Sequence, residues 1–425
     1  MNLFKSPVIR DSVIFICLFS LFLWVGIARN VGGLQSVIWS DAEGYYMYLP
    51  AMFIQESIHN VPLRTMDYRK NDKGEIVMKY TCGVAYFFLP FFLVANSYAH
   101  IFHYNSSGFS TPYYYAIIVC GVFWAFIGLF LLRTLLLRFF SSKTTWITII
   151  CILLGTNLFH YVTRQMGMSH IYSFLLTSAI LLVADDYYKK PTKGRIFLLA
   201  FLVGWHILVR PTNCIMIIAL LLLGVTTRAD LNERLGFLKT RLQDIALAIP
   251  FFLLPIVPQL LYWKEVLGKW VVYSYKGESF IYWNNPKILA VLFDPLNGWL
   301  LYSPVILFAL LGLVIRRKDK RTNSIAVTTI FIIITYTFAS WWSWNFGQAF
   351  GHRCYIEYLP LFAFPFAITI ERILAIKKVY VKAAVFSLLL VTLYYSVALS
   401  FLNDTQFITK QWDWVGYNLL INHIY

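Results

Sequence analysis

Apolar runs recur along the whole chain, and several approach the ~20 residues that a helix needs to cross a bilayer core. Of the 425 residues, 59% are hydrophobic and only 13% are charged, whereas soluble domains are about one quarter charged. A soluble chain of this composition would have too little polar surface to face water. The sequence therefore predicts an all-α polytopic membrane protein, embedded as a multi-pass integral membrane protein.

The formal net charge is +16. In a soluble protein that excess would favour nucleic-acid binding. In a membrane protein, Lys and Arg gather in cytoplasmic loops by the positive-inside rule, so we expect no nucleic-acid partner. Lys5 and Arg10 precede the first apolar run, which lacks a small-residue cleavage site. We interpret this run as an uncleaved anchor with its basic end inside.

The basic clusters also fix the expected topology. If residues 81–99 crossed the membrane, the basic group at 133–143 would fall outside, so we expect 81–99 to be a helix in the outer interface or a re-entrant pair. The sequence then predicts about eleven transmembrane helices in one unit spanning 1–425. It has a first external loop at 29–112, with interfacial helices, and a second at 263–298. The expected spans are 13–28, 113–132, 145–161, 171–184, two short helices within 196–225, 245–262, 299–315, 324–340, 354–370 and 383–402.

Two acids, Asp41 and Glu43, open an aromatic stretch in the first external loop. One interpretation is a general base that takes a proton from a hydroxyl. The alternative is a solvated loop start, or a helix N-cap at Asp41. In an extended segment the two acids share a face, but on a helix they do not. The aromatic residues of 44–50 are also typical of a belt at the membrane interface.

Several basic side chains are expected at the same outer level, where polar groups collect. Arg353, after a glycine-containing segment, and Arg210, before Pro211, carry planar forks suited to phosphate. Each is also consistent with a snorkelling or internally paired arginine. Lys79 and His352 are the further phosphate-binding candidates, with a solvated loop lysine as the alternative for Lys79. His170 and His206 are interpreted as structural histidines. The remaining polar residues expected at this level are Arg164, Asp294 and Glu357.

The cysteines show no pair or spacing typical of a metal site, and no P-loop, zinc-protease or nucleophile-elbow motif is present. We predict no metal and no cofactor. Cys82 and Cys354 both fall in segments expected on the outer side, which leaves a disulfide between them open. No internal repeat supports an inverted-repeat transporter.

Taken in order, the motifs span nearly the whole chain and resemble the GT-C class of membrane glycosyltransferases. The resemblance is to bacterial relatives of the protein O-mannosyltransferases and to the transferase that adds aminoarabinose to lipid A. The chain has only a short tail where some members carry a soluble C-terminal domain. The matching segments are 41–43 (DAE), 79–83 (KYTCG) continuing to Pro90, 209–212 (VRPT), 297–298 (NG) ahead of 302–304 (YSP), and 346–353 (FGQAFGHR) continuing to Pro360.

The resemblance implies a glycosyltransferase that takes a sugar from a polyprenyl-phosphate donor on the outer face of a bacterial inner membrane. Asp41 would be the base, with Glu43 as its neighbour or substitute. Arg353, Arg210, Lys79 and His352 would contact phosphate, and an apolar groove would hold the prenyl chain among the membrane lipids. The acceptor stays open between lipid, glycan and protein.

Two other classes of function remain as alternatives. A polytopic transporter or lipid flippase would depend on residues near the membrane midplane, such as His206. A non-catalytic assembly subunit of a cell-envelope complex would depend on neither acid.

Overall fold

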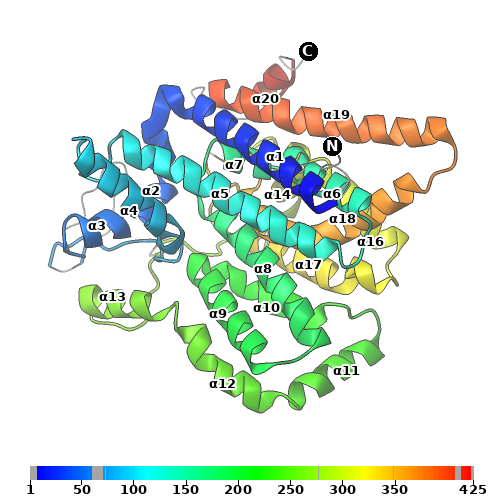
Figure 1. Cartoon of the computed structure of the whole chain (residues 1–425), viewed down its shortest axis with the longest axis horizontal. Coiled ribbons are helices and arrows are strands. Elements are labelled where there is room, and N and C mark those ends of the chain that lie inside the picture. Colours follow the sequence, from blue (N-terminus) through cyan, green and yellow to red (C-terminus); the bar gives the residue numbers. More distant parts are fainter. Residues whose placement is uncertain are drawn as a thin grey trace.

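The computed structural model describes residues 7–59, 70–71, 73–275, 277–347, 349–406 and 413–422. These residues form helices and connecting segments, with an isolated bridge between Lys70 and Ile76 and no strand among them (Figure 1). The all-α prediction is therefore confirmed for the described chain. Residues 60–69 and 72 of the predicted first external loop, and residue 276 of the second, lie outside the described residues.

Within the described part of the chain, six helical segments are long and apolar enough to cross a membrane, and the bent pair α12 (Leu242–Leu253) and α13 (Val257–Leu267) makes a seventh if the pair counts as one span. The chain is thus membrane-embedded and multi-pass. The predicted count of about eleven also includes shorter helices and is not confirmed by helix length. These segments are α1 (Pro7–Asn30) with the 3₁₀ turn that follows it, α5 (Thr111–Leu136), α8 (Ser169–Lys189), α17 (Ser324–Ser340) and α18 (Leu359–Leu374) each with the 3₁₀ turn before it, and α19 (Val379–Gln406).

Shorter apolar helices accompany them: α4 (Ala85–Ile101), α6 (Ser142–Gly155), η3 with α10 (Pro211–Ile215 and Met216–Leu222), and α16 (Ile306–Ile315). The other helices are α9 (Lys193–Val209), α12 (Leu242–Leu253) and α13 (Val257–Leu267). The short and surface helices are η2 (Val31–Ile38), α2 (Asp41–Tyr46), α3 (Tyr48–Phe53), α7 (Leu158–Thr163), α11 (Arg228–Lys239), α14 (Ile288–Phe293), α15 (Trp299–Tyr302), η4 (Lys320–Thr322), η5 (Arg353–Tyr358) and α20 (Trp414–Ile421).

Prolines break the helices where the sequence predicts discontinuity. Proline removes a backbone donor and disfavours helix at the residue before it. The predicted pair of short helices in 196–225 is confirmed, because Arg210 is extended between α9 and η3. The single kinked crossing expected at 245–262 is instead two helices, α12 and α13, bent by 51°. The span expected at 299–315 is likewise divided, with Ser303 and Pro304 between α15 and α16.

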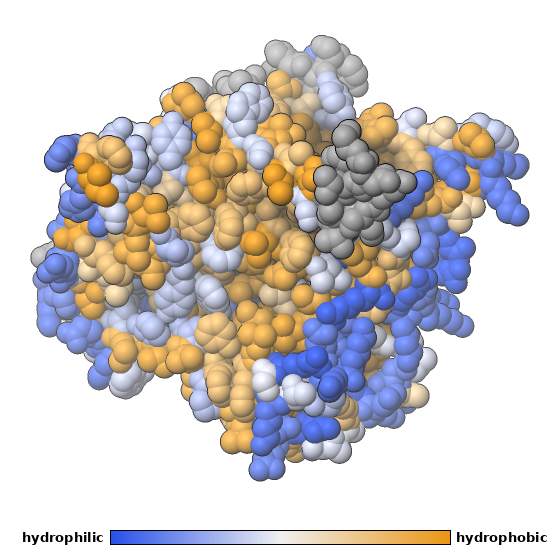
Figure 2. All heavy atoms as spheres, viewed as in Figure 1, coloured by the Kyte–Doolittle hydropathy of each residue, from blue (hydrophilic) through white to orange (hydrophobic). Residues whose placement is uncertain are grey.

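Polarity divides the surface into two ends and a middle. In Figure 2 hydrophilic residues gather at the lower right and at the left edge, and hydrophobic residues predominate between them. The right-hand side holds the C-terminal end of α5 and the N-terminal end of α19, whereas the opposite ends of these helices lie towards the left (Figure 1). We call the first of these the basic end, because the cluster at 316–321 and the lysines of 377–382 lie there. We call the other the α2 end.

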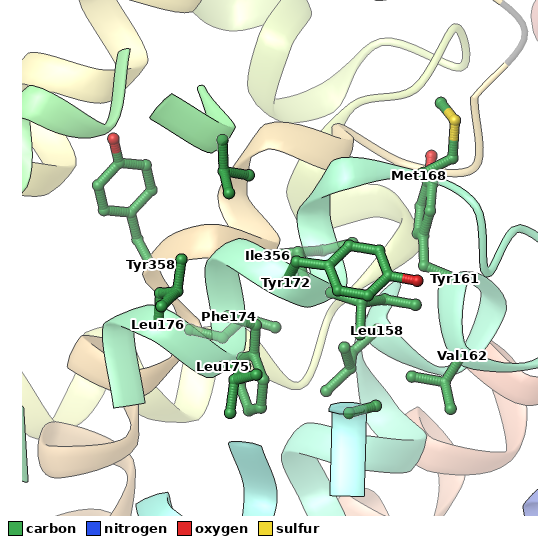
Figure 3. Packing of buried hydrophobic residues seen from close by; sticks show 14 of the residues in the cluster. Leu158, Tyr161, Val162, Met168, Tyr172, Phe174, Leu175, Leu176, Ile356 and Tyr358 are labelled. Atoms are coloured by element: carbon green, nitrogen blue, oxygen red, sulfur yellow. The ribbon is translucent and has the colours of Figure 1, made fainter. Parts of the chain in front are cut away.

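Helix α8 is the centre of the bundle. Its residues from Ser169 to Ser178 are all buried, as expected for a helix covered by neighbours on every side. Figure 3 shows Tyr172, Phe174 and Leu176 of α8 packed in one hydrophobic cluster with side chains of α7 and η5. This packing supports η5, the segment that carries Arg353.

The start of the first external loop does not lie free in solvent. Helices η2, α2 and α3 fold back onto the bundle, and every residue from Ala42 to Ala51 is buried. The aromatic stretch therefore belongs to the core: Tyr46 packs edge-on against Phe92, and the Tyr48 hydroxyl donates to the Tyr80 carbonyl. The interpretation of this stretch as an interfacial aromatic belt is therefore wrong. The alternative for Asp41 and Glu43, a solvated loop start or an N-cap at Asp41, is wrong as well, because both acids lie within α2 and Ser40 is its N-cap.

Candidate active site

A cavity of about 510 Å³ opens at the α2 end of the bundle. Its wall combines segments far apart in the sequence: η2 and α2, the junction of α9 with η3, the second external loop, and the ends of α17 and η5. The wall carries Asp41, Lys79, Arg210, Glu278 and Arg353, with aromatic side chains between them. The tertiary fold therefore gathers charged residues that the sequence separates by up to some three hundred positions.

Asp41 and Arg353 form an ion pair on this wall. Arg353 Nη2 donates to Asp41 Oδ2 at 2.8 Å, and the Tyr80 hydroxyl donates to Asp41 Oδ1 at 2.5 Å. The two charged side chains are only 15% and 13% exposed, respectively. The carboxylate thus has one fixed charged partner and one fixed neutral donor.

These neighbours keep Asp41 ionised. Burial alone raises the pKa of a carboxyl group. Around Asp41, the Arg353 guanidinium, the Tyr80 hydroxyl, Arg210 and Lys79 outweigh burial, so the pKa of Asp41 lies below its ordinary value. Burial and the nearby Asp41 charge raise the pKa of Tyr80 well above its ordinary value, so Tyr80 remains a hydrogen-bond donor.

A strained turn places Asp41 at the first position of α2. Ser40 has φ 56° and ψ −131°, a conformation that favours glycine at the first central position of a type II′ turn. The turn is closed by the Ala42 N–H, which donates to the Trp39 carbonyl at 3.2 Å. Non-glycine residues held in such conformations cost of order 1 kcal/mol and cluster at functional sites.

Arg210 is the second cation of the cavity, and its three nitrogens face three residues. Nε lies 2.8 Å from Glu357 Oε1, Nη1 donates to Ser169 Oγ at 3.4 Å, and Nη2 donates to Cys354 Sγ at 3.2 Å. Glu357 Oε1 also lies 2.9 Å from His170 Nδ1. Arg210 is therefore held from behind by α8 and η5.

Lys79 is the third cation, and it pairs with Glu278 of the second external loop. Its Nζ also lies 5.1 Å from the centre of the Tyr275 ring, within cation–π range. Gly83 lets the segment after Lys79 pass close to α9, because a Cβ at this position would lie 2.6 Å from the Val209 nitrogen. This close approach brings Lys79 to the same wall as Arg210.

Of the six residues that the sequence singles out, Asp41, Lys79, Arg210 and Arg353 line the cavity. Glu43 and His352 are fully buried and are not among the described residues of its wall. Because Asp41 and Glu43 lie two positions apart on a helix, they point in different directions. His352 stacks on Phe338, and its Nε2 lies 3.0 Å from the Trp344 carbonyl.

The remaining polar residues expected at this level have other neighbours. The Asp294 carboxylate accepts from the Leu296 N–H in a turn, and Arg164 donates to Ser36 and Asn30. His206, which the sequence places near the midplane rather than at this level, has its Nε2 3.2 Å from the Thr177 hydroxyl within the helical bundle. These contacts are thus with residues other than the charged residues of the cavity wall.

Sequence reasoning missed several partners of these cations. Glu278 and Tyr275 lie in the second external loop, and nothing in their spacing links them to Lys79. Glu357 follows Arg353 by four positions. The one sequence feature that could have pointed to it is that it was expected at the same outer level as the other polar residues. Its role as the partner of Arg210 depends on the packing of η5 against α8.

Three buried side chains offer atoms that metals bind. His170 Nδ1, Cys354 Sγ and a Glu357 oxygen lie within 4.8 Å of one another. Arg210 already contacts both Glu357 and Cys354, so a dication would have to compete with a guanidinium. Cys82 and Cys354 are both buried free thiols, and the disulfide left open between them is not formed.

No protein-family model, curated protein or solved structure matches this chain. Function is therefore inferred from the cavity itself. Three cations surround space for an anion, and an ionised carboxylate on the same wall can accept a proton from a hydroxyl group.

Proposed function

We propose that this protein is a membrane glycosyltransferase that transfers a sugar from a polyprenyl-phosphate donor to an acceptor hydroxyl. The observation that carries the proposal is the Asp41–Arg353 ion pair on the wall of a cavity that also contains Arg210 and Lys79. The pair places a proton acceptor and a phosphate-binding group side by side, and glycosyl transfer from a lipid phosphate needs both.

The proposed reaction is a displacement at the anomeric carbon. The bond from that carbon to the phosphate oxygen breaks, and its electron pair leaves with the phosphate. A new bond forms to the acceptor oxygen, whose proton passes to the Asp41 carboxylate. Arg353, Arg210 and Lys79 stabilise the charge on the departing phosphate, and the sugar phosphate already carries the activation that transfer needs.

Binding of the donor also changes Asp41. In the empty cavity Arg353 holds the pKa of Asp41 low, which makes its carboxylate a weak base. A phosphate that takes Arg353 as its partner removes part of this stabilisation. The pKa of Asp41 then rises, so the base becomes stronger when the donor is in place.

The membrane setting supports a lipid-linked donor. The cavity opens at the end of an apolar bundle opposite the basic loops, which by the positive-inside rule is the outer side. In this proposal the shorter apolar helices also cross, to give about eleven spans in a bacterial inner membrane. The prenyl chain lies along the apolar surface, and the acceptor is a lipid, glycan or protein.

A reconstituted transfer assay tests the proposal. Purified protein in vesicles is given radiolabelled polyprenyl-phosphate sugars and crude envelope acceptors, and wild type is compared with Asp41→Asn. We expect label transfer by wild type and at least a roughly hundredfold lower rate for Asp41→Asn, with both proteins melting as folded species. Equal rates would remove Asp41 from the role of base.

A matched control comes from the basic end. Asp11 pairs with Arg133, and both side chains are nearly buried, as in the Asp41 pair. Asp11→Asn should lower thermal stability and leave the transfer rate of the folded fraction unchanged. Flux of labelled lipid without transfer in the same vesicles would favour the transporter alternative. If wild type shows neither flux nor transfer, and neither variant differs from it except in stability, an assembly subunit is favoured.

A further inference from the structure

The three cations of the cavity differ in where their acidic partners lie. Asp41 and Glu278, the partners of Arg353 and Lys79, are on the cavity wall. Glu357, the partner of Arg210, is fully buried and is not among the described residues of that wall. An anion in the cavity can therefore compete directly for Arg353 and Lys79, but it cannot reach the carboxylate behind Arg210.

The surroundings of Glu357 show how Arg210 is fixed. Glu357 Oε1 lies 2.8 Å from Arg210 Nε and 2.9 Å from His170 Nδ1. Ser169 and Cys354 accept from the two other nitrogens of the guanidinium. A guanidinium has five N–H groups, so these contacts leave two N–H groups for a ligand.

We propose that Glu357 is a positioning residue that fixes Arg210 as the permanent phosphate anchor, while Arg353 and Lys79 exchange their acidic partners for the ligand. This inference rests on the proposed function for its substrate, a lipid monophosphate. Glu357 acts only through Arg210, because the arginine lies between the carboxylate and the cavity. The anchor keeps the phosphate in one place while the Asp41–Arg353 pair opens.

The charge balance gives an unusual expectation for Glu357→Gln. Removing the buried carboxylate leaves Arg210 without its counter-ion, which destabilises the empty site. A phosphate then relieves an unpaired charge on binding. We expect a short-chain polyprenyl monophosphate to bind about threefold more tightly, whereas kcat falls about tenfold because the anchor is no longer oriented. Simple loss of structure would weaken both together.

A double-mutant cycle gives the decisive test. In an Arg210→Gln background, Glu357→Gln should produce no further fall in kcat, and the double variant should melt above either single variant because no buried charge is left unpaired. This comparison holds even if Glu357→Gln alone folds poorly. An equal fall in kcat from Glu357→Gln in both backgrounds would overturn the proposal, as would weaker lipid-phosphate binding by folded Glu357→Gln.

Binding and transfer are measured separately, so the two proposals can fail separately. If wild type binds the polyprenyl monophosphate but transfers no sugar, the proposed function fails. Lipid-phosphate binding by Glu357→Gln and the melting temperatures of the single and double variants then still test the anchor. If wild type does not bind this lipid, the anchor proposal is overturned whatever the transfer assay shows.

Discussion

Two aspartate–arginine pairs, one at each end of the bundle, have the same chemistry and nearly the same burial. Asp11 and Arg133 at the basic end are 14% and 9% exposed, and Asp41 and Arg353 are 15% and 13% exposed. Both pairs join elements far apart in the sequence. Neither charge type nor burial separates them, so any difference in role must come from their surroundings.

Both pairs have aromatic neighbours: the Trp146 indole donates to Asp11 at 3.0 Å and lies 4.8 Å from the Arg133 guanidinium. Likewise the Tyr80 hydroxyl donates to Asp41, and the Phe346 ring lies 5.8 Å from the Arg353 guanidinium. The surroundings differ in one respect. At the α2 end Asp41 and Arg353 share a wall with empty space and two more cations. A pair enclosed by packing stabilises the fold, whereas a pair beside a cavity can exchange partners.

The largest expected effect comes from removing each aspartate charge. Asp41→Asn should reduce transfer by about 10³-fold, within the range for loss of a general base. It should lower the melting temperature less than Asp11→Asn does, because Arg353 lines a cavity that water can enter. Asp11→Asn should leave transfer intact and lower the melting temperature by several degrees, because it leaves Arg133 unpaired. Rates per folded molecule and thermal melts measure both. If Asp11→Asn lowered transfer while Asp41→Asn lowered only the melting temperature, the two pairs would not have the roles assigned to them.

The arginines give the next largest effect. Arg353→Gln should lower kcat/KM by about 10²-fold, as for loss of one group that stabilises developing charge. It also removes the charge that holds the pKa of Asp41 low. The acid limb of the pH–rate profile should therefore move to higher pH. Arg133→Gln is the matched control and should leave that limb in place; a shift in the control would contradict the assignment.

A smaller effect is expected in how the melting temperatures of wild type and Asp41→Asn change at acid pH. Because the folded-state pKa of Asp41 is below its ordinary value near 3.8, its ionisation stabilises the folded protein above about pH 4. That contribution is lost as pH falls through the lowered pKa. The difference in melting temperature between wild type and Asp41→Asn should therefore shrink between about pH 5 and pH 2. A constant difference across this range would show that charge is not involved.

The smallest expected effect concerns the turn before Asp41. Ser40 holds a positive φ that glycine adopts without strain, so Ser40→Gly should stabilise the protein by about 1 kcal/mol. A thermal melt measures the gain. Gly33, outside this turn, offers a control in the opposite sense. Gly33→Ala adds a side chain at an exposed position with space around it and should stabilise through lower backbone entropy of the unfolded chain. If Ser40→Gly instead destabilises the protein by a similar amount, only backbone entropy is at work and Ser40 is not strained.

The sequence alone was sufficient for the class of fold. Apolar runs predict helices in a bilayer regardless of how those helices pack, and a proline after Arg210 predicts the break that the structure contains. Charge bias also identifies which basic groups lie together, because it depends only on their position along the chain. The topology expected from that bias places four polar residues at one outer level: Asp41, Lys79, Arg210 and Arg353.

Packing decided what the sequence could not. Whether Asp41 and Glu43 share a face depends on the local backbone, which is helical because α2 is folded into the bundle rather than extended in a loop. The partners Glu278 and Glu357 are set by contacts between distant segments. The length of a run likewise cannot show that α12 and α13 bend apart by 51°.

The pairing of each cavity cation with one carboxylate has a consequence for selectivity. Asp41 and Glu278 on the wall offset the charges of Arg353 and Lys79, so the empty cavity exerts less net pull on anions arriving from water than three unpaired cations would. Soluble phosphates and nucleotides, which depend on long-range attraction, gain little by entering. An anion that is already concentrated at the membrane by an apolar tail needs no such attraction. In the proposed function, this pairing of charges therefore favours a lipid phosphate over soluble phosphates and nucleotides.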